Sequence, residues 1–152
     1  MSSMTKLAQV CQALNEAEAR YVVVGAQAVN LWGVTRGTRD IDVLIEATTE
    51  NAQRVLDGLA SVGFVLVRDL DAAEVARKPV TVVGDIYRVD IFTLAWAVRY
   101  PEADPEAQTF RIENVDVPTI SIRHLIASKR TGRLQDAADI EMLEAIERLR
   151  GE

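Results

Sequence analysis

The sequence predicts an α+β fold in which a mixed central β-sheet is flanked by helices. In the first half of the chain, short apolar runs alternate with segments whose apolar residues recur at helical spacing. In the second half, paired β-branched runs flank turn residues, a pattern typical of hairpins. Strands interleaved with helices and followed by hairpins favour a mixed sheet over a purely parallel or antiparallel one.

The first half is expected to alternate helices with strands. Leu7, Val10 and Leu14 share one face of the first segment, as an amphipathic helix requires. The run from Tyr21 to Val24 is short and wholly apolar, which indicates a buried strand. In order, the expected elements are a helix over 4–17, a strand over 21–24, a helix over 26–32, a strand over 38–46, a helix capped by Thr48 or Thr49, and a strand over 64–67.

The second half is expected to contain two hairpins and a helical C-terminal segment. Residues 69–78 are ambiguous and allow a short helix. The remaining expected elements are a hairpin with a two-residue turn at Gly84-Asp85, a polar loop over 101–107, a hairpin over 108–120, and helix over 121–149 in two pieces that meet near Gly132. Residues 1–152 are predicted to form one minimal domain, with its core over 18–120 and C-terminal helices over 121–150.

Composition restricts the classes of function. The chain has 152 residues with 17 basic and 23 acidic side chains, a net charge of −6, which disfavours wrapping nucleic acid. A basic patch at Lys129, Arg130 and Arg133 keeps a local contact with RNA open. The single cysteine, Cys11, excludes an internal disulfide and is consistent with a reducing compartment. No membrane-spanning run or export signal is present, so we expect a cytoplasmic protein.

Asp40 and Asp42 are the most informative residues. Successive strand side chains point to opposite faces, so these two carboxylates share one face of their strand. Two adjacent carboxylates repel each other and are costly to desolvate, and a divalent cation between them removes that cost. Asp90, which shares a strand face with Arg88, is the candidate third carboxylate of a two-metal site. Mg²⁺ is the expected ion, because oxygen donors suit a hard cation.

A phosphate site is expected beside these acids. The strand over 21–24 stops at Gly25 and a helix begins at once. The free N–H groups at a helix N-terminus and the helix dipole favour an anion, and glycine allows it a close approach. The sequence therefore predicts a triphosphate that is held at one end by backbone amides and at the other end by metal.

These residues together resemble the pattern of the polymerase-β-like nucleotidyltransferase superfamily. That pattern is a Gly followed by Gly or Ser, a gap, two acids separated by one apolar residue, and a third acid on a later strand. Here Gly25-Ala26 precedes thirteen intervening residues and then Asp40-Ile41-Asp42. The stretch RGTRDID is similar to the R-x-T-x-D-x-D form of small bacterial members, including those similar to AbiE-type abortive-infection toxins. The segment HLIASKRTGRLQDAADIEML is similar to the C-terminal helical element of that group.

The resemblance implies an Mg²⁺-dependent enzyme that moves a nucleoside monophosphate from an NTP to an acceptor hydroxyl and releases pyrophosphate. The acceptor would be an RNA end, a protein or a small molecule. Asp40 and Asp42 would ligate both metals, and Asp90 the catalytic one. The nucleotide-binding residues implied by the resemblance are Gly25, Ala26, Arg36, Thr38, Arg39 and Lys129. The chain departs from the pattern at Ala26, where a lost hydroxyl contact would weaken phosphate binding by about 1 kcal/mol.

Two other classes of function stay open. One is a catalytically weak or inactive protein of this fold that binds a partner, because small members of the superfamily often act in toxin–antitoxin pairs. A cognate toxin or antitoxin would then be the partner. The other is a haloacid-dehalogenase-like phosphatase, which is less favoured because its first acid lies at the end of a strand.

Several residues also have structural interpretations. Lys129 and Arg133 are equally consistent with a solvated helix face, and Asp136 and Asp139 with ion pairs to Arg133 that pin the final helix. His124 has neither a cysteine nor a second histidine with which to bind zinc, so we expect it at the surface or in packing. Trp32 and Trp96 are expected in the core or at its edge rather than in base stacking.

Overall fold

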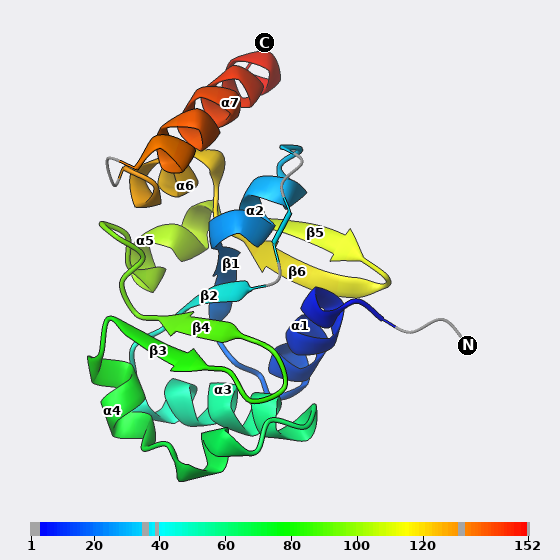
Figure 1. The fold of residues 1–152 in the computed structure, drawn as a ribbon, viewed down its shortest axis with the longest axis vertical. Coiled ribbons are helices and arrows are strands. Elements are labelled where there is room, and N and C mark those ends of the chain that lie inside the picture. Colours follow the sequence, from blue (N-terminus) through cyan, green and yellow to red (C-terminus); the bar gives the residue numbers. More distant parts are fainter. Residues whose placement is uncertain (1–3, 35–36, 39, 131–132, 152) are drawn as a thin grey trace.

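The computed structural model describes residues 4–34, 37–38, 40–130 and 133–151. In this part of the chain, six strands form one mixed sheet in the order β3-β4-β2-β1-β6-β5 (Figure 1). The strands are β1 (Tyr21–Val24), β2 (Ile41–Ile45), β3 (Val80–Val83), β4 (Val89–Phe92), β5 (Gln108–Ile112) and β6 (Val115–Thr119). β1 runs antiparallel to β2 and parallel to β6, and β2 runs parallel to β4. The predicted α+β fold with a mixed sheet is confirmed.

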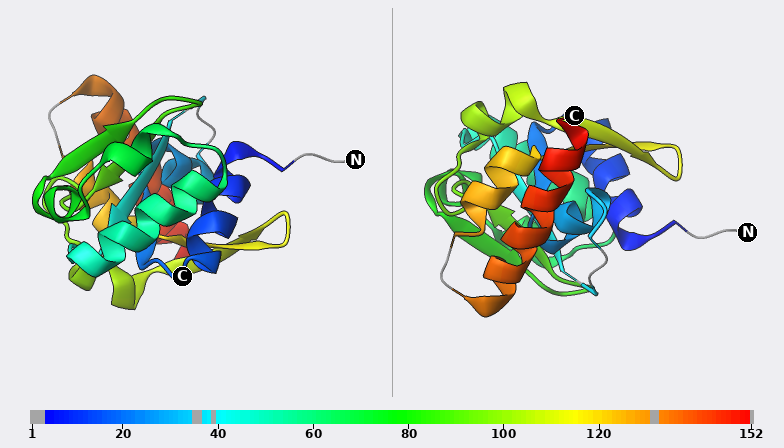
Figure 2. Two further views of the ribbon diagram at one scale, coloured as in Figure 1. Left: turned by 90° about the horizontal axis from the view of Figure 1, so that it is seen from below. Right: turned by 90° about the horizontal axis from the view of Figure 1, so that it is seen from above.

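Helices cover both faces of this sheet. The α-helices are α1 (Lys6–Glu16), α2 (Gly25–Leu31), α3 (Thr49–Ser61), α4 (Ala72–Arg77), α5 (Tyr100–Ala103), α6 (Ile122–Ser128) and α7 (Leu134–Arg150). Two short 3₁₀ helices are η1 (Leu66–Asp69) and η2 (Asp104–Glu106). Figures 1 and 2 show α1, α3 and α4 on one side of the sheet and α2, α6 and α7 on the other. No helix in the described residues is both long and apolar enough to span a membrane.

Two predictions are wrong in this region: the strand over 64–67, and the two-residue turn at Gly84-Asp85. The carboxylate of Asp85 is involved in both. The Asp85 carboxylate accepts hydrogen bonds from the N–H groups of Val65 (2.6 Å) and Leu66 (3.1 Å). These donors are therefore not free for a strand partner, and the segment continues into the 3₁₀ helix η1. Because Asp85 reaches across to this segment, the β3–β4 connection spans residues 84–88 instead of two residues.

Other differences are smaller. The strand predicted over 38–46 is limited to β2, and the polar loop predicted over 101–107 contains α5 and η2. The Glu102 carboxylate accepts from the Arg99 N–H at 3.4 Å, and Pro101 lies in the first turn, so this polar segment begins a short helix. The two helical pieces predicted over 121–149 are present as α6 and α7.

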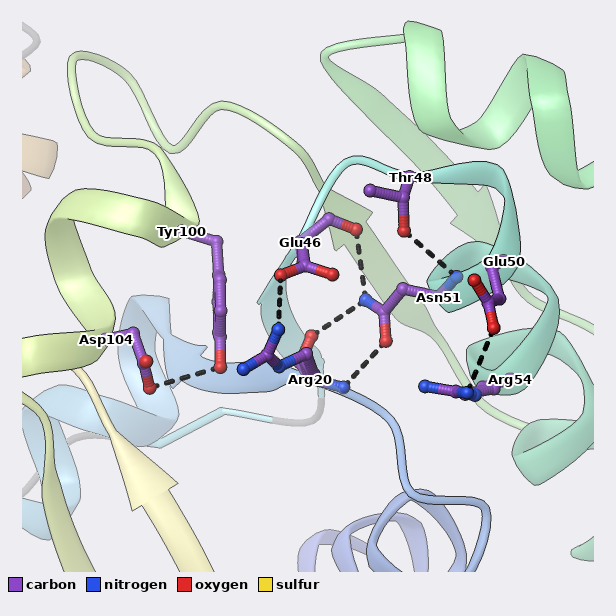
Figure 3. A network of polar contacts seen from close by, with 8 residues as sticks. All are labelled: Arg20, Glu46, Thr48, Glu50, Asn51, Arg54, Tyr100 and Asp104. Atoms are coloured by element: carbon purple, nitrogen blue, oxygen red, sulfur yellow. Dashed lines mark hydrogen bonds and ion pairs between the residues drawn. The ribbon is translucent and has the colours of Figure 1, made fainter.

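Asn51, at the start of α3, joins the beginning of β1 to the end of β2 (Figure 3). Its Oδ1 accepts from the N–H of Arg20 at 2.7 Å, and its Nδ2 donates to the carbonyl oxygens of Arg20 (2.9 Å) and Glu46 (3.0 Å). The Thr48 hydroxyl caps α3 by accepting from the Asn51 N–H at 3.1 Å. This buried amide fixes two strands whose opposite ends, at Val24 and Asp42, are paired with each other.

Replacement of Asn51 by alanine is therefore expected to lower the free energy of unfolding by about 2–3 kcal/mol, because buried backbone groups lose their partners. Urea denaturation measures the change. Gln53→Ala is the matched control, since Gln53 is an exposed amide on the same helix and is expected to change stability by less than about 0.5 kcal/mol. Equal stabilities of the two variants would show that the Asn51 contacts do not hold these strands.

Candidate active site

The pairing of β2 with β4 brings the predicted acids together. In the parallel register, Asp42 lies directly opposite Asp90, and Asp40 lies just before β2. All three carboxylates line one cavity of about 600 Å³. Residues separated by about fifty positions in the chain thus meet because two parallel neighbours present the same face at the same level.

The surroundings of Asp42 strongly perturb the pKa of its carboxyl group. Its Oδ1 is buried without a hydrogen-bond partner among the described residues. Burial, followed by the negative charges of Asp90 and Asp40, raises the pKa of Asp42 from 3.8 to about 7, while Lys129 lowers it. A carboxyl group in this environment is poorly stabilised as an anion, and a cation beside it would remove the conflict.

Gly25 makes the close approach between α2 and Asp42 possible. Its φ of +68° lies in the left-handed region, and a Cβ atom at this position would lie 2.1 Å from Asp42 Oδ2. The N-cap residue Val24 has no side-chain group to accept from the first N–H groups of α2. Glycine is therefore required here by both the backbone conformation and the carboxylate that lies against it.

Arg88 is a site residue whose role the sequence analysis missed. Its Nε donates to Asp90 Oδ1 at 2.9 Å and its Nη2 to Asp90 Oδ2 at 3.2 Å, while the same Nε lies 3.9 Å from Asp40 Oδ2. The sequence did contain a signal for this contact, because alternation along a strand places residues 88 and 90 on the same face. The guanidinium therefore neutralises part of the acidic cluster.

The three carboxylates approach one another without forming a ready metal site. Within the ranges that the structure describes, no group of three or more His, Cys, Asp or Glu side chains is placed to hold a metal ion. Asp90 and Asp40 are turned toward Arg88 instead. The donors still fit a hard cation, because they are all oxygens and because Asp42 Oδ1 has no partner there. Metal binding would require Asp90 to exchange the guanidinium for the ion.

Lys129 lines the cavity but is held by other acids. It is the C-cap residue of α6 and is 8% exposed, so its interpretation as part of a solvated helix face is wrong. Its Nζ lies 3.3 Å from Asp136 Oδ1 and 3.3 Å from Asp139 Oδ2. Arg133 Nη2 lies 2.7 Å from Asp136 Oδ2. This ion cluster pins α7 to α6, as the structural interpretation of Asp136 and Asp139 expected.

Lys129→Met is accordingly expected to lower the free energy of unfolding by about 2–4 kcal/mol, because two carboxylates that are 2% and 3% exposed lose a cation. Thermal unfolding monitored by circular dichroism reports the loss. The adjacent, exposed Arg130 provides the control variant Arg130→Met, for which we expect little change. If Lys129→Met kept full stability and lost only nucleotide affinity, Lys129 would serve the ligand and not the helix junction.

The remaining predicted site residues fall into two groups, and His124 was expected outside the site. Ala26 and Thr38 line the cavity, and the Thr38 hydroxyl donates to the Asp40 carbonyl at 3.3 Å. Arg36 and Arg39 lie outside the described residues. His124 is buried against Ser121, as the packing interpretation expected.

The two tryptophans differ. Trp32 is buried as expected, whereas the expectation that Trp96 packs in or beside the core is wrong. Trp96 is 57% exposed and lines the cavity with the acids.

The architecture is that of nucleotidyltransferase-like proteins. The structure of a lincomycin-bound lincosamide antibiotic adenylyltransferase, LnuA, matches with a TM-score of 0.60 and 15% identity, over 95% of this chain and 99% of that one. The structure of an antigenic nucleotidyltransferase-like protein from Paracoccidioides brasiliensis matches with a TM-score of 0.58 and 17% identity, over 94% of this chain and 74% of that one. No protein-family model and no curated protein sequence matches the chain. At these identities, the likeness shows the fold alone, that of nucleotidyltransferase-like proteins.

Proposed function

We propose that the chain is an Mg²⁺-dependent nucleotidyltransferase that moves a nucleoside monophosphate from an NTP to an acceptor hydroxyl, with release of pyrophosphate. The observation that carries this proposal is the placement of Asp42 opposite Asp90, with Asp40 and Gly25 on the same cavity. The fold supports it, because similar structures include an adenylyltransferase.

In this proposal, Asp40, Asp42 and Asp90 hold the magnesium. When bound, Mg²⁺ supplies the positive charge that stabilises the transferred phosphoryl group and activates the acceptor oxygen. Gly25 and Ala26 place backbone N–H groups beside the cavity, where the phosphates would lie. Thr38 lies on the same wall. The cation of Lys129 also faces this cavity, although its two carboxylate partners reduce the charge it offers to a phosphate.

A small-molecule hydroxyl is the acceptor that the observations favour. The net charge of −6 disfavours RNA. The LnuA chain, described as a lincosamide antibiotic adenylyltransferase, is covered almost completely, which supports a fold of this size acting on a small molecule without a separate acceptor-binding domain. A protein acceptor remains the second choice, since the cavity is open to solvent at Trp96.

The proposal is tested by incubating the protein with each α-labelled NTP and Mg²⁺ in a lysate, followed by separation of small molecules, RNA and protein. We expect label on a small molecule with wild type and none with Asp40→Ala. Asp57→Asn, a change of an exposed acid on α3, is the control that should label normally. Absence of label with all four NTPs would contradict the proposal.

The second candidate is an inactive protein of this fold that binds a partner, such as a cognate toxin or antitoxin. Two observations favour it: Ala26 lacks a phosphate-binding hydroxyl, and Arg88 already neutralises Asp90. This candidate predicts no nucleotide binding by calorimetry, together with co-purification of a second protein that survives the Asp42→Asn change.

A further inference from the structure

Trp96 occupies a tight turn at the edge of the acidic cavity. Ala95 and Val98 form an isolated antiparallel bridge, in which the Ala95 N–H donates to the Val98 carbonyl at 2.8 Å and the Val98 N–H donates back at 3.1 Å. Trp96 is the first of the two residues between them. It follows β4, the strand that carries Asp90, so the turn is anchored to the acid-bearing part of the sheet.

Trp96 is in an unfavourable state in two respects, its backbone conformation and its exposure to solvent. Its φ of +59° is left-handed, a region that bulky residues rarely adopt and that glycine occupies readily in such turns. The residue is also 57% exposed, although its indole is a large apolar ring. Strained backbone at a cavity edge commonly has a functional origin.

The second tryptophan shows what a structural role looks like in this chain. Trp32 is 8% exposed, its Nε1–H donates to the Ile120 carbonyl at 2.8 Å, and its ring contacts Phe110 edge to face at 5.2 Å. Among the described residues, Trp96 makes no such hydrogen bond or ring contact. Its indole therefore contributes little to the core and is available to a ligand.

Trp96 lines the same cavity as the residues that are predicted to hold the phosphates and their cation. Its lining includes the three acids and Gly25, and it also includes Trp96 with the apolar residues Phe92 and Ala95. A nucleoside triphosphate carries groups of both kinds, an anionic chain that suits a cation held by the acids and a flat ring that suits an aromatic side chain. An aromatic side chain stacks on any base, because every base has a π-face.

We propose that Trp96 is the stacking platform for the base of the nucleotide, an inference that rests on the proposed nucleotidyltransferase function. Trp96 fixes the base while Gly25 and the acids hold the triphosphate and its cation. Because stacking does not read hydrogen-bonding edges, it contributes affinity for purine and pyrimidine nucleotides alike, and more for the larger purine rings.

The test uses ATP and inorganic tripolyphosphate, each with Mg²⁺, as probes of the base and of the phosphate chain. The chain has two tryptophans, so the buried Trp32 serves as an internal reference for fluorescence. We expect ATP to quench the Trp96 emission of wild type and tripolyphosphate to leave it unchanged. By calorimetry, Trp96→Leu weakens ATP binding by about tenfold or more and leaves tripolyphosphate binding within about twofold.

Trp96→Phe is the matched variant, and it is expected to recover most of the ATP affinity because a ring remains. Trp96→Gly is expected to unfold at a higher temperature than wild type while it binds ATP more weakly, since glycine relieves the left-handed strain. A role of Trp96 in folding alone predicts the opposite change in stability.

Four results would overturn the inference. Unchanged ATP affinity in Trp96→Leu would remove the platform and leave the proposed function standing. Equal weakening of ATP and tripolyphosphate would mean that Trp96 shapes the cavity and does not stack. Quenching by an aromatic acceptor, with ATP affinity unaffected by the variants, would assign the ring to the acceptor. Failure of wild type to bind either probe would overturn both the inference and the proposed function.

Discussion

Replacement of Asp42 by asparagine is expected to abolish nucleotidyl transfer, with a fall in rate of at least about a thousandfold. The substitution puts a neutral amide in place of the carboxylate that lies opposite Asp90 and faces the cavity. Transfer of label from an α-labelled NTP measures the effect. Asp57→Asn, the exposed control, should retain the wild-type rate. An active Asp42→Asn variant would remove Asp42 from the site.

The same variant should become more stable at neutral pH in buffer without divalent ions. Because the pKa of Asp42 is about 7 when folded and near 3.8 when unfolded, the native state binds more protons between these values. Wild-type stability therefore falls as the pH rises from 4 to 7, by about 2–4 kcal/mol in total, and the loss is complete above pH 7. The variant lacks this loss, because its amide does not titrate.

Urea denaturation in the presence of EDTA, at pH 4 and at pH 8, compares the two proteins. We expect similar stability at pH 4 and a more stable Asp42→Asn variant at pH 8. A variant that was several kcal/mol less stable than wild type at pH 8 would indicate that the Asp42 carboxylate is a structural group and not one placed for a cation.

Gly25→Ala is expected to have the second large effect, on both stability and transfer. The new Cβ would lie 2.1 Å from Asp42 Oδ2 at a left-handed φ, so either α2 or the carboxylate must move. We expect a loss of about 2–4 kcal/mol in the free energy of unfolding and a fall in transfer, because Asp42 leaves its position opposite Asp90. Gly84→Ala is the matched control, since a Cβ there meets no atom within 4 Å.

A double-mutant cycle separates the contact with Asp42 from the backbone strain. In the Asp42→Ala background the clashing Oδ2 and Cγ are gone and only the Cβ of residue 42, at 3.0 Å, stays close, so the cost of Gly25→Ala should shrink toward that of the left-handed φ. If the cost were the same in both backgrounds, Gly25 would be required by its backbone and not by the carboxylate.

The acids could be predicted from sequence because local rules fix their geometry. The two-residue period of a strand places Asp40 and Asp42 on one face, and an apolar run that ends in glycine before a helix marks the neighbouring turn. The prediction that Asp90 joins them also depended on β2 and β4 being neighbours in the sheet. The α+β pattern of the sequence predicted the correct type of sheet, a mixed one.

What sequence could not provide depends on contacts distant in the chain or on side-chain direction. Asp85 takes the backbone donors of a segment twenty residues away and turns an expected strand into η1. Lys129 is buried because Asp136 and Asp139 fold back on it from α7. The exposure of Trp96 depends on a two-residue turn that its composition does not suggest.

The central claim is that the carboxylates on β2 and β4 bind a divalent cation together with a nucleotide. Calorimetric titration of Mn²⁺ into the protein with a non-hydrolysable NTP analogue, at pH 8, tests it most directly. We predict saturable Mn²⁺ binding by wild type and by Asp57→Asn, and its loss in Asp42→Asn and Asp90→Asn. Mn²⁺ binding that was unchanged in the last two variants, or absent from wild type, would contradict the claim.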